Sequence, residues 1–354
     1  MKPVYLTGRA LASVLGMNLA QALSSLRSAV APSATAYPLA GHGDWPYCRI
    51  PGNSHGWDER ARALITQVAA DAGAAQARDG ALFIATSCQD GEAAGHAERN
   101  NDFHALAQRM GAWLDWRGPV FLLSSACTSS MQALLSASEW LRAGTATQAL
   151  VLGVELDNQL TLPGFAALQL LSPKCSQPFA LPRDGLVLGE AVAALRLSTE
   201  PTAPWQLMGG ANVVDGSQPT SASATAVTLM CQRALATSGL SSTDVDLIKV
   251  QASGSPGNDA SEAEGLRAAF ARVPALVSLK PLIGHCMGAS GAAEIALLLE
   301  CLDQGFWPRC TDAVDPALGV QLAPQAPPQL NCILAAILGF GGGHAGVLLQ
   351  RSPS

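Results

Sequence analysis

The chain has few charged residues, no C-x-x-C pair and no long apolar run. Asp, Glu, Lys and Arg make up 14% of its 354 residues, against roughly 25% in an ordinary globular protein. So little surface charge indicates that a sizeable area is buried between subunits. Without a C-x-x-C pair, zinc ribbons and thioredoxin-like redox motifs have no support. Without a run of about 18 apolar residues, no segment is expected to span a membrane.

The N-terminal segment also lacks the features of a secretory signal. Residues 1–27 contain neither a compact apolar core nor a cleavage site of small residues. The cysteines are odd in number and scattered, at positions 48, 88, 127, 175, 231, 286, 301, 310 and 332. A reduced, cytoplasmic protein is therefore expected. The net charge of −6 gives no electrostatic reason to expect nucleic acid or an anionic membrane as a partner.

Short aliphatic runs alternate with Ala- and Leu-rich stretches along the whole chain. This alternation is typical of an α/β fold with buried strands. Strands are expected at residues 4–8, 81–87, 119–125, 149–155, 190–197, 247–253, 275–280, 332–340 and 345–350.

The order of features in the first half of the chain recurs in the second. Residues 79–91 and 244–257 each contain a strand followed by a polar, glycine-containing loop. Residues 120–144 and 277–305 each contain a strand, a turn of small residues and a helix that closes near a glycine. The similarity predicts two like halves that pack about a pseudo-twofold axis.

The boundary between the halves is expected near residues 199–206, a Pro/Thr stretch typical of a linker. The two predicted units are 1–200 and 201–354. Positions 127 and 285 each lie at the start of the corresponding helix, one in each unit. A pseudo-twofold arrangement would bring them together.

Cys127 lies where a predicted strand meets a predicted helix, in the stretch SSACTSSM. A helix N-terminus stabilises a thiolate through its free N–H groups and partial positive charge, so the position suits a nucleophile. The small residues that follow let a substrate approach, and the Cys127 amide would point toward a developing oxyanion. The other interpretation is a packed small apolar residue, the commonest fate of a free cysteine. The local sequence leaves both open.

Two of the six histidines occur in segments that could reach this turn. His285 precedes a run of small residues in the matching helix start, and Lys280 and Glu294 flank it where they could orient it or tune its pKa. His344 follows GFGGG (339–343) and could line the same cavity, although either ring could instead be a satisfied buried histidine. GFGGG lacks the Lys-Ser/Thr of a P-loop, so nucleotide binding is not expected. The remaining histidines are expected to be solvated: His42, His55, His96 and His104.

Together, these segments resemble the elongating β-ketoacyl-acyl carrier protein synthases of the thiolase superfamily. The likeness runs over nearly the whole chain and rests on motifs in the right order. They are SSACTSSMQAL (124–134), GFAALQLLS (164–172) with QPFALPRDGLVLGEAVAAL (177–195), VQASGSPGNDASEAEGL (250–266), LKPLIGHCMGASGAAE (279–294) and LGFGGGHAGVLL (338–349). The resemblance implies a thiolase-like, duplicated α-β-α-β-α layered fold with two similar halves about a pseudo-twofold.

The resemblance also implies roles for the candidate site residues. Cys127 would accept an acyl group from a carrier protein as a thioester, with its own amide and that of Phe340 as the oxyanion hole. His285 would hydrogen-bond the carbonyl of a malonyl unit, and Lys280 and Glu294 would support it. Phe340 also matches a gating position beside the cysteine. No cofactor or metal is implied beyond the phosphopantetheine arm of the carrier protein.

The same resemblance places two further residues in the substrate-binding loop and exposes one departure. Gly341 and His344 follow Phe340 in the segment that matches the family's FGFGGTN, and His344 would partly replace a missing donor. The departure is Ser253, which stands where the family's HGT motif has histidine, in a loop two residues shorter before Asn258. Losing one donor from a transition-state site typically costs about 10²–10³ in rate.

Two functions of different classes follow from these features. The first is a condensing enzyme with a Cys127–Ser253–His285 site, acting on acyl chains of fatty-acid, polyketide or aryl-polyene type. The alternative is a chain-length-factor-like subunit that does not condense and pairs with an active ketosynthase. A degradative thiolase is disfavoured because His344 stands where its second cysteine would be. Expected partners are an acyl carrier protein and a second synthase subunit, in a homodimer or a heterodimer.

Overall fold

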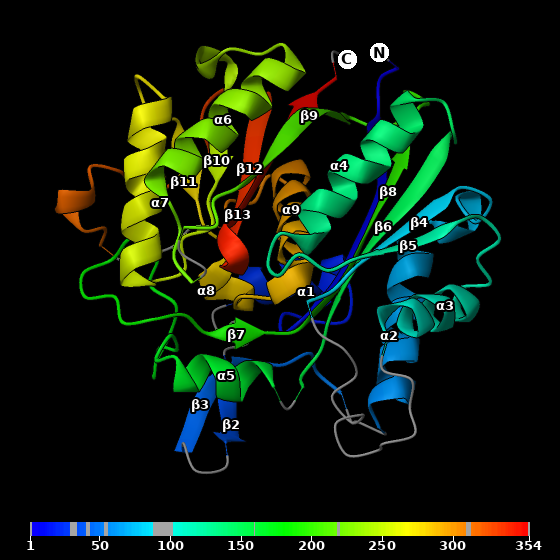
Figure 1. Cartoon of the computed structure of the whole chain (residues 1–354), viewed down its shortest axis with the longest axis horizontal. Coiled ribbons are helices and arrows are strands. Elements are labelled where there is room, and N and C mark those ends of the chain that lie inside the picture. The colour runs from blue at the N-terminus through cyan, green and yellow to red at the C-terminus, as the bar shows by residue number, and fades with distance from the viewer. Residues whose placement is uncertain are drawn as a thin grey trace.

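The strands of the fold form one long mixed sheet and one small sheet (Figure 1). The structure is a computed structural model. It describes residues 2–28, 34–39, 43–52, 56–87, 102–158, 160–217, 220–308 and 313–352. Several residues considered above lie outside these ranges, namely His42, His55, Cys88, His96 and Cys310.

The long sheet has ten strands in the described part of the chain, five from each half of the sequence. The first half contributes β1 (Tyr5–Ser13), β4 (Ala81–Ala85), β5 (Val120–Leu123), β6 (Gln148–Glu155) and β8 (Ala191–Ser198). The second half contributes β9 (Trp205–Val214), β10 (Leu247–Lys249), β11 (Ala275–Val277), β12 (Cys332–Gly339) and β13 (Gly343–Arg351). Almost every residue of β4, β6, β8, β12 and β13 is buried, as expected for strands covered on both faces.

The order of the strands in this sheet is symmetric about its centre. It runs β11-β10-β12-β13-β9-β1-β8-β6-β4-β5. Each half therefore places its strands in the same sequence from the centre outward: first, fifth, fourth, second, third. The halves join where β1 pairs antiparallel with β9, at Tyr5 and Gln206. This topology is the duplicated, pseudo-twofold arrangement expected from the sequence.

The helices lie in layers on and between the strands (Figure 1). Bounds of the longer helices are α1 (Leu19–Arg27), α2 (Trp57–Asp71), α3 (Phe103–Trp113), α4 (Ser129–Arg142), α6 (Ala224–Ser238), α7 (Pro256–Ala269) and α9 (Ser290–Asp303). Short helices are α5 (Thr161–Ala167) and α8 (Lys280–Ile283). Helices α2 and α3 cover one outer face, and α6 and α7 cover the other. Side chains of Asn18, Asp102 and Ser223 cap α1, α3 and α6.

Helices α4 and α9 form the central layer. They pack on each other and on strands of both halves. Every residue of 290–299 in α9 is buried. A close approach is possible because Gly291 has no side chain: a Cβ there would lie 2.6 Å from the Met131 side chain of α4. The N-terminal ends of α4 and α9, which follow Cys127 and His285 in the sequence, therefore meet in the middle of the molecule.

A small sheet lies beside this core. It consists of β2 (Thr35–Leu39), β3 (Gly43–Cys48) and β7 (Leu188–Gly189). Glu190 follows β7, is fully buried, and receives hydrogen bonds from Arg60, the Ile50 amide and the Asp157 amide. No helix in the described residues is long and apolar enough to cross a membrane.

Several strands differ from those expected, among them β1, which continues to Ser13. Strand β9 is absent from the predictions because it begins inside the expected linker and contains Gly209 and Gly210, which weaken a strand pattern. The strand predicted at 247–253 ends at Lys249. The strand predicted at 275–280 ends at Val277, and Lys280 instead begins α8, since Pro281 suits the first turn of a helix.

Candidate functional site

Cys127 occupies a sharp turn between β5 and α4. The preceding residue, Ala126, has a φ of 51°, a left-handed conformation that costs a non-glycine residue about 1–3 kcal/mol. Hydroxyl groups hold the turn: Ser129 Oγ donates to the Ala126 carbonyl at 2.6 Å and accepts from the Ser125 amide at 2.9 Å. Thr128 Oγ1 donates to the Ser125 carbonyl at 2.8 Å. The small polar residues around the cysteine therefore fix its backbone.

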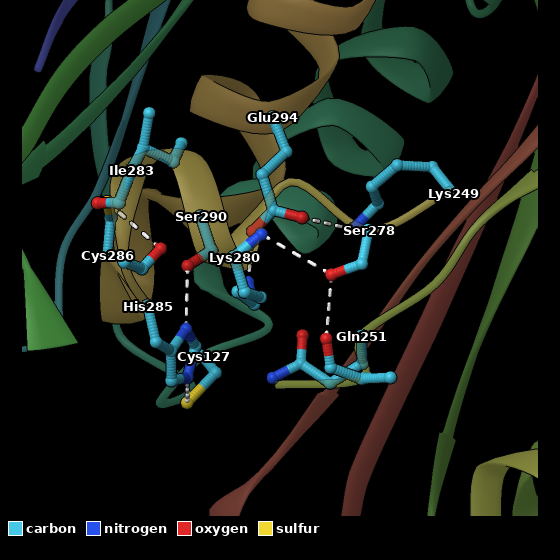
Figure 2. Close-up of polar contacts among 12 residues, drawn as sticks. Cys127, Lys249, Gln251, Ser278, Lys280, Ile283, His285, Cys286, Ser290 and Glu294 are labelled. Carbon is cyan, nitrogen blue, oxygen red and sulfur yellow. Dashed lines mark hydrogen bonds and ion pairs between the residues drawn. The ribbon is translucent and has the colours of Figure 1, made fainter. Parts of the chain in front are cut away.

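His285 faces Cys127 from the second half of the chain (Figure 2). Its Nε2 lies 3.0 Å from Cys127 Sγ, and its Nδ1 lies 2.9 Å from Ser290 Oγ. The His285 amide donates to the Val187 carbonyl at 2.7 Å, and Gly284, with a φ of 72°, makes the turn into this position. Both side chains are buried. The predicted meeting of positions 127 and 285 is confirmed.

Burial decides the charge state of this pair. Desolvation raises the pKa of the Cys127 thiol to about 11, although Lys280 and the backbone N–H groups of Phe340 and Cys127 lower it. The backbone N–H at the helix start lowers the pKa of this thiol, as expected, but burial outweighs this effect. Desolvation, with nearby Lys280 and Lys249, holds the pKa of His285 well below its usual range. At neutral pH the pair is a thiol facing a neutral imidazole.

A buried ion cluster lies behind His285 (Figure 2). Lys280 Nζ contacts Glu294 Oε1, and Lys249 Nζ contacts Glu294 Oε2 at 2.8 Å and the Ala336 carbonyl at 2.6 Å. All three charged side chains are fully buried. Two lysines share one carboxylate, so the cluster has a positive charge while both remain protonated. Desolvation lowers the pKa of Lys249 to about 8 despite the Glu294 charge.

Lys249 is a residue that the sequence reasoning missed. It lies in β10 between Ile248 and Val250, and the sequence pattern predicts only a strand there. A single charge inside an otherwise buried strand is the signal that could have found it, because a buried lysine needs a partner. That partner, Glu294, is 45 residues away in sequence.

The loop after β12 lies against the cysteine. Phe340 stacks on Phe165 of α5, with ring centroids 5.2 Å apart and planes 8° from parallel. The φ values of Gly341 and Gly342 are 77° and 74°, so the loop turns through left-handed conformations that favour glycine. A Cβ on Gly339 would lie 3.3 Å from the Cys127 nitrogen. The Phe340 amide reaches the thiol, and its ring covers the site.

His344 does not share this cavity, contrary to expectation. Its ring is fully buried, with Nδ1 2.7 Å from the Gly342 carbonyl and Nε2 accepting from the Ser223 amide at 3.2 Å. These bonds assign the proton to Nδ1 and occupy both nitrogens. His344, the second residue of β13, ties the loop to the start of α6 through these bonds and does not line the cavity. It cannot replace a missing donor beside Cys127.

Residues 251–254 form a loop held by two buried carboxylates of α7. Glu262 accepts hydrogen bonds from the amides of residues 251 and 252, both at 2.7 Å. Asp259 accepts from the amides of Ser253 and Gly254, both at 3.1 Å. Ser253 is buried and lines the cavity with Cys127. A second loop residue, Gln251, also lines it and was not singled out from the sequence.

The cavity itself joins the two halves. Its volume is about 460 Å³, including the part that opens to solvent, and its lining includes Cys127, His285, Phe340 and Phe165. Nucleophile, imidazole and backbone N–H donors face this one space. The arrangement suits transfer of an acyl group to sulfur, since it provides a nucleophile, a proton acceptor and an oxyanion site.

Stability should depend on the charge of Glu262. Burial raises its pKa to about 7, against the lowering by the amides of residues 251 and 252 and by Lys249. A carboxyl group whose pKa is higher in the folded state contributes stability below its unfolded pKa, and loses it as pH rises through the folded value. Between about pH 4.5 and pH 7 the wild type should therefore lose this contribution.

Glu262→Gln tests this dependence by urea unfolding at pH 5 and pH 8. An amide accepts through only one of its two end atoms, so the variant should be less stable at pH 5, by about 1–3 kcal/mol. The difference in unfolding free energy between the variant and the wild type should be smaller at pH 8, because the wild type then buries a charged carboxylate and is itself less stable. Glu264→Gln, on the exposed side of the same helix, is the matched control. A deficit that grows with pH contradicts the prediction.

Models of one family match both halves of the chain. The β-ketoacyl synthase N-terminal domain matches residues 56–203, and the C-terminal domain matches residues 208–313. Among solved structures, a ketosynthase–chain length factor complex from Xenorhabdus doucetiae has a TM-score of 0.84 at 23% identity, over 99% of this chain and 98% of that chain. A β-ketoacyl synthase from Burkholderia phymatum STM815 has a TM-score of 0.84 at 22% identity over the whole of both chains. The thiolase-like fold class is confirmed.

Curated sequences give the same similarity. Nodulation protein E of Rhizobium sp. (strain N33) is 29% identical over 226 residues, which are 60% of this chain and 56% of that protein. The chloroplastic 3-oxoacyl-(acyl-carrier-protein) synthase II of Arabidopsis thaliana is 28% identical over 258 residues, which are 66% of this chain and 48% of that protein. The chain thus spans about half the length of these curated relatives.

Proposed function

This chain belongs to the β-ketoacyl synthase family, and on that premise we propose that it loads an acyl group from a carrier protein onto Cys127 and extends it by decarboxylative condensation. The observation that carries the proposal is the Cys127–His285 pair, whose Sγ and Nε2 atoms lie 3.0 Å apart and whose residues line one cavity. The amides of Cys127 and Phe340 beside the thiol supply the oxyanion site.

In the loading step, the acyl group moves from one sulfur to another. Cys127 Sγ attacks the thioester carbon of the acyl-carrier protein and gives its proton to the neutral His285 Nε2. The two amides hold the oxyanion. The bond to the phosphopantetheine sulfur then breaks, and that sulfur takes the proton from His285. The products are the acyl-Cys127 thioester and the free carrier thiol.

In the condensation step, a malonyl-carrier protein replaces the first carrier. The bond to its carboxylate breaks, CO₂ leaves, and the electron pair moves onto the thioester carbonyl oxygen as an enolate. In this step the neutral His285 ring is in the tautomer that carries its proton on Nε2, and this N–H donates to that oxygen. A second donor comes from the 251–254 loop in which Ser253 was expected, and Lys280 and Glu294 support the imidazole. The enolate carbon attacks acyl-Cys127, which expels the Cys127 thiolate. The thiolate takes one proton from solvent, and the product is a 3-oxoacyl-carrier protein.

The proposed partners are an acyl carrier protein and a second synthase subunit. Strand β5 lies at the end of the long sheet, and each of its four residues, Val120–Leu123, is half-buried. The outer edge of β5 pairs with no other strand in the described ranges, and an apolar strand with such an edge is a ready site for pairing with another chain. A second copy of this chain or a different ketosynthase would fit, and similar solved chains occur in complexes of ketosynthase with chain length factor.

A chain-length-factor-like role is the second candidate. It is favoured by the cavity lining, in which His285 is the single histidine among the described residues. One imidazole supplies one donor where the family resemblance implies two. A subunit in this role would shape the acyl cavity without loading Cys127.

The experiment that separates the two roles uses the wild-type chain with purified carrier proteins. After incubation with an acyl-carrier protein, intact mass should increase by one acyl group, and peptide mapping should locate it on Cys127. Addition of malonyl-carrier protein should release CO₂ and return the chain to its starting mass. A chain that stays unmodified, and that releases CO₂ only when a second ketosynthase is added, has the chain-length-factor role instead.

A further inference from the structure

Gln251 is a buried amide that faces the reaction cavity. It follows β10 by two residues, is 7% exposed, and lines the same cavity as Cys127 and His285. Among the described residues, none hydrogen-bonds its Oε1, although the atom is buried. Buried polar side chains in folded proteins are almost always paired. An amide whose oxygen has no partner is not fixed by the protein itself, and the end of this amide on the side of Cys127 is the nitrogen, a donor that a ligand oxygen in the cavity can meet.

The backbone of Gln251 is fixed, so its side chain is presented from a rigid base. Its amide donates to Glu262 Oε1 at 2.7 Å, and the next amide, of Ala252, donates to Glu262 Oε2 at 2.7 Å. Ser278 Oγ donates to the Ala252 carbonyl, also at 2.7 Å. Figure 2 shows the amide nitrogen of Gln251 on the side that faces Cys127. A donor held in this way loses little freedom on meeting a substrate, which is the condition for transition-state stabilisation.

The chemistry of an amide restricts what Gln251 can do. Its two N–H groups donate, and its oxygen accepts. It does not titrate near neutral pH, so it binds an oxygen without transferring a proton. Ser253, the other polar candidate of this loop, has a shorter side chain whose single O–H reaches less far from the backbone. Of the two, Gln251 is suited to a carbonyl oxygen deep in the cavity.

We propose that Gln251 Nε2 donates a hydrogen bond to the thioester carbonyl oxygen of the carrier-bound malonyl unit, and that Gln251 rather than Ser253 is the second donor beside His285. The inference rests on the proposed function. When CO₂ leaves, the electron pair of the broken carbon–carbon bond moves onto this oxygen, and the hydrogen bond strengthens as negative charge develops. No proton leaves Gln251, and the enolate carbon carries the pair to the acyl group.

The test compares Gln251→Leu with Ser253→Ala in the full chain, and Gln232→Leu, at an exposed position of α6 outside the cavity lining, serves as the matched control. Three quantities are measured: acyl loading of Cys127 by intact mass, CO₂ release from malonyl-carrier protein, and thermal unfolding. Gln251→Leu should load Cys127 like the wild type while its CO₂ release falls about 10²–10³-fold. Ser253→Ala should lose less than about tenfold, and Gln232→Leu should keep the wild-type rates.

Histidine substitutions at positions 251 and 253 test the same assignment through a gain of CO₂ release instead of a loss. An imidazole at position 251 can donate to the same oxygen, so Gln251→His should release CO₂ far faster than Gln251→Leu. Ser253→His should bring no gain over the wild type. A merely structural role for Gln251 would instead lower loading and thermal stability together with CO₂ release, and histidine would not rescue it.

Three outcomes would contradict the role of Gln251, the condensation step or the loading step. Undiminished CO₂ release in Gln251→Leu, or a larger loss in Ser253→Ala, refutes the role of Gln251 and leaves loading and condensation intact. A wild type that loads Cys127 but never releases CO₂ refutes condensation and the Gln251 inference together. A wild type that neither loads nor releases CO₂ refutes the proposed function itself.

Discussion

Cys127→Ala is expected to abolish acyl loading, by at least about 10⁴-fold, because removing a covalent nucleophile leaves no group that can form the thioester. In the part of the chain that the structure describes, no other cysteine lines the cavity. Burial raises the pKa of Cys231 and of Cys332 to about 12, and neither lines the cavity. Intact mass after incubation with acyl-carrier protein should show the unmodified chain. Thermal stability should change little, since the substitution deletes one buried atom, at a cost of about 1 kcal/mol.

Two further variants make this result specific. Cys231→Ala removes a buried thiol from α6, far from the site, and should load like the wild type. Cys175 is exposed, so Cys175→Ser removes the thiol that would otherwise react without selectivity. Loading that persists in Cys127→Ala, or that disappears in Cys231→Ala, contradicts the assignment. The wild-type loading rate should rise with pH, because the pKa of the Cys127 thiol is about 11 and the thiolate is the nucleophile.

Glu294→Ala is expected to destabilise the fold by about 3–5 kcal/mol, since it leaves two buried lysines without their shared carboxylate. Lys249 and Lys280 both contact Glu294, and none of the three side chains is exposed. Urea unfolding at pH 7 measures the loss. The matched control is Glu300→Ala on the same helix: Glu300 pairs with Arg9 at 2.7 Å but is partly exposed, so its loss should be about 1 kcal/mol or less.

The pH dependence of Glu294→Ala has a definite sign. Glu294 raises the pKa of Lys249, so its removal lowers that pKa further and the variant's folded state binds fewer protons. The wild type then loses stability relative to the variant as pH rises toward about 8, the folded pKa of Lys249. The deficit should be larger at pH 6 than at pH 9. A deficit independent of pH would show that lost packing, rather than unpaired charge, accounts for the destabilisation.

Local pattern explains which parts of the fold could be predicted. Buried strands such as β4, β6 and β12 are continuous aliphatic runs, and the pattern of each half repeats, so both the fold class and the meeting of Cys127 with His285 followed from sequence. Strand β9 (Trp205–Val214) could not be predicted in this way. It begins inside the Pro/Thr stretch that resembles a linker, and its two glycines weaken the strand pattern. The end of β10 at Lys249 was equally hidden, since apolar residues continue beyond it.

Tertiary structure alone decided the electrostatics. A thiol at a helix start favours a lowered pKa in isolation, yet complete burial of Cys127 outweighs that effect. His344 is close to Phe340 in sequence but does not line the cavity, because the ladder between β12 and β13 sets the direction of each side chain. Neither desolvation nor side-chain direction can be read from neighbouring residues.

The sequence by itself determined the family and the duplicated fold, and it indicated Cys127, His285, Lys280 and Glu294 as candidate site residues, since ordered motifs and helix starts are local features. Only the tertiary structure decided that Lys249 joins Glu294, that His344 leaves the site, and that Gln251 enters it. These three assignments depend on which side chains share one buried space. That space is built by segments up to about 210 residues apart, whose contacts arise only when both halves pack.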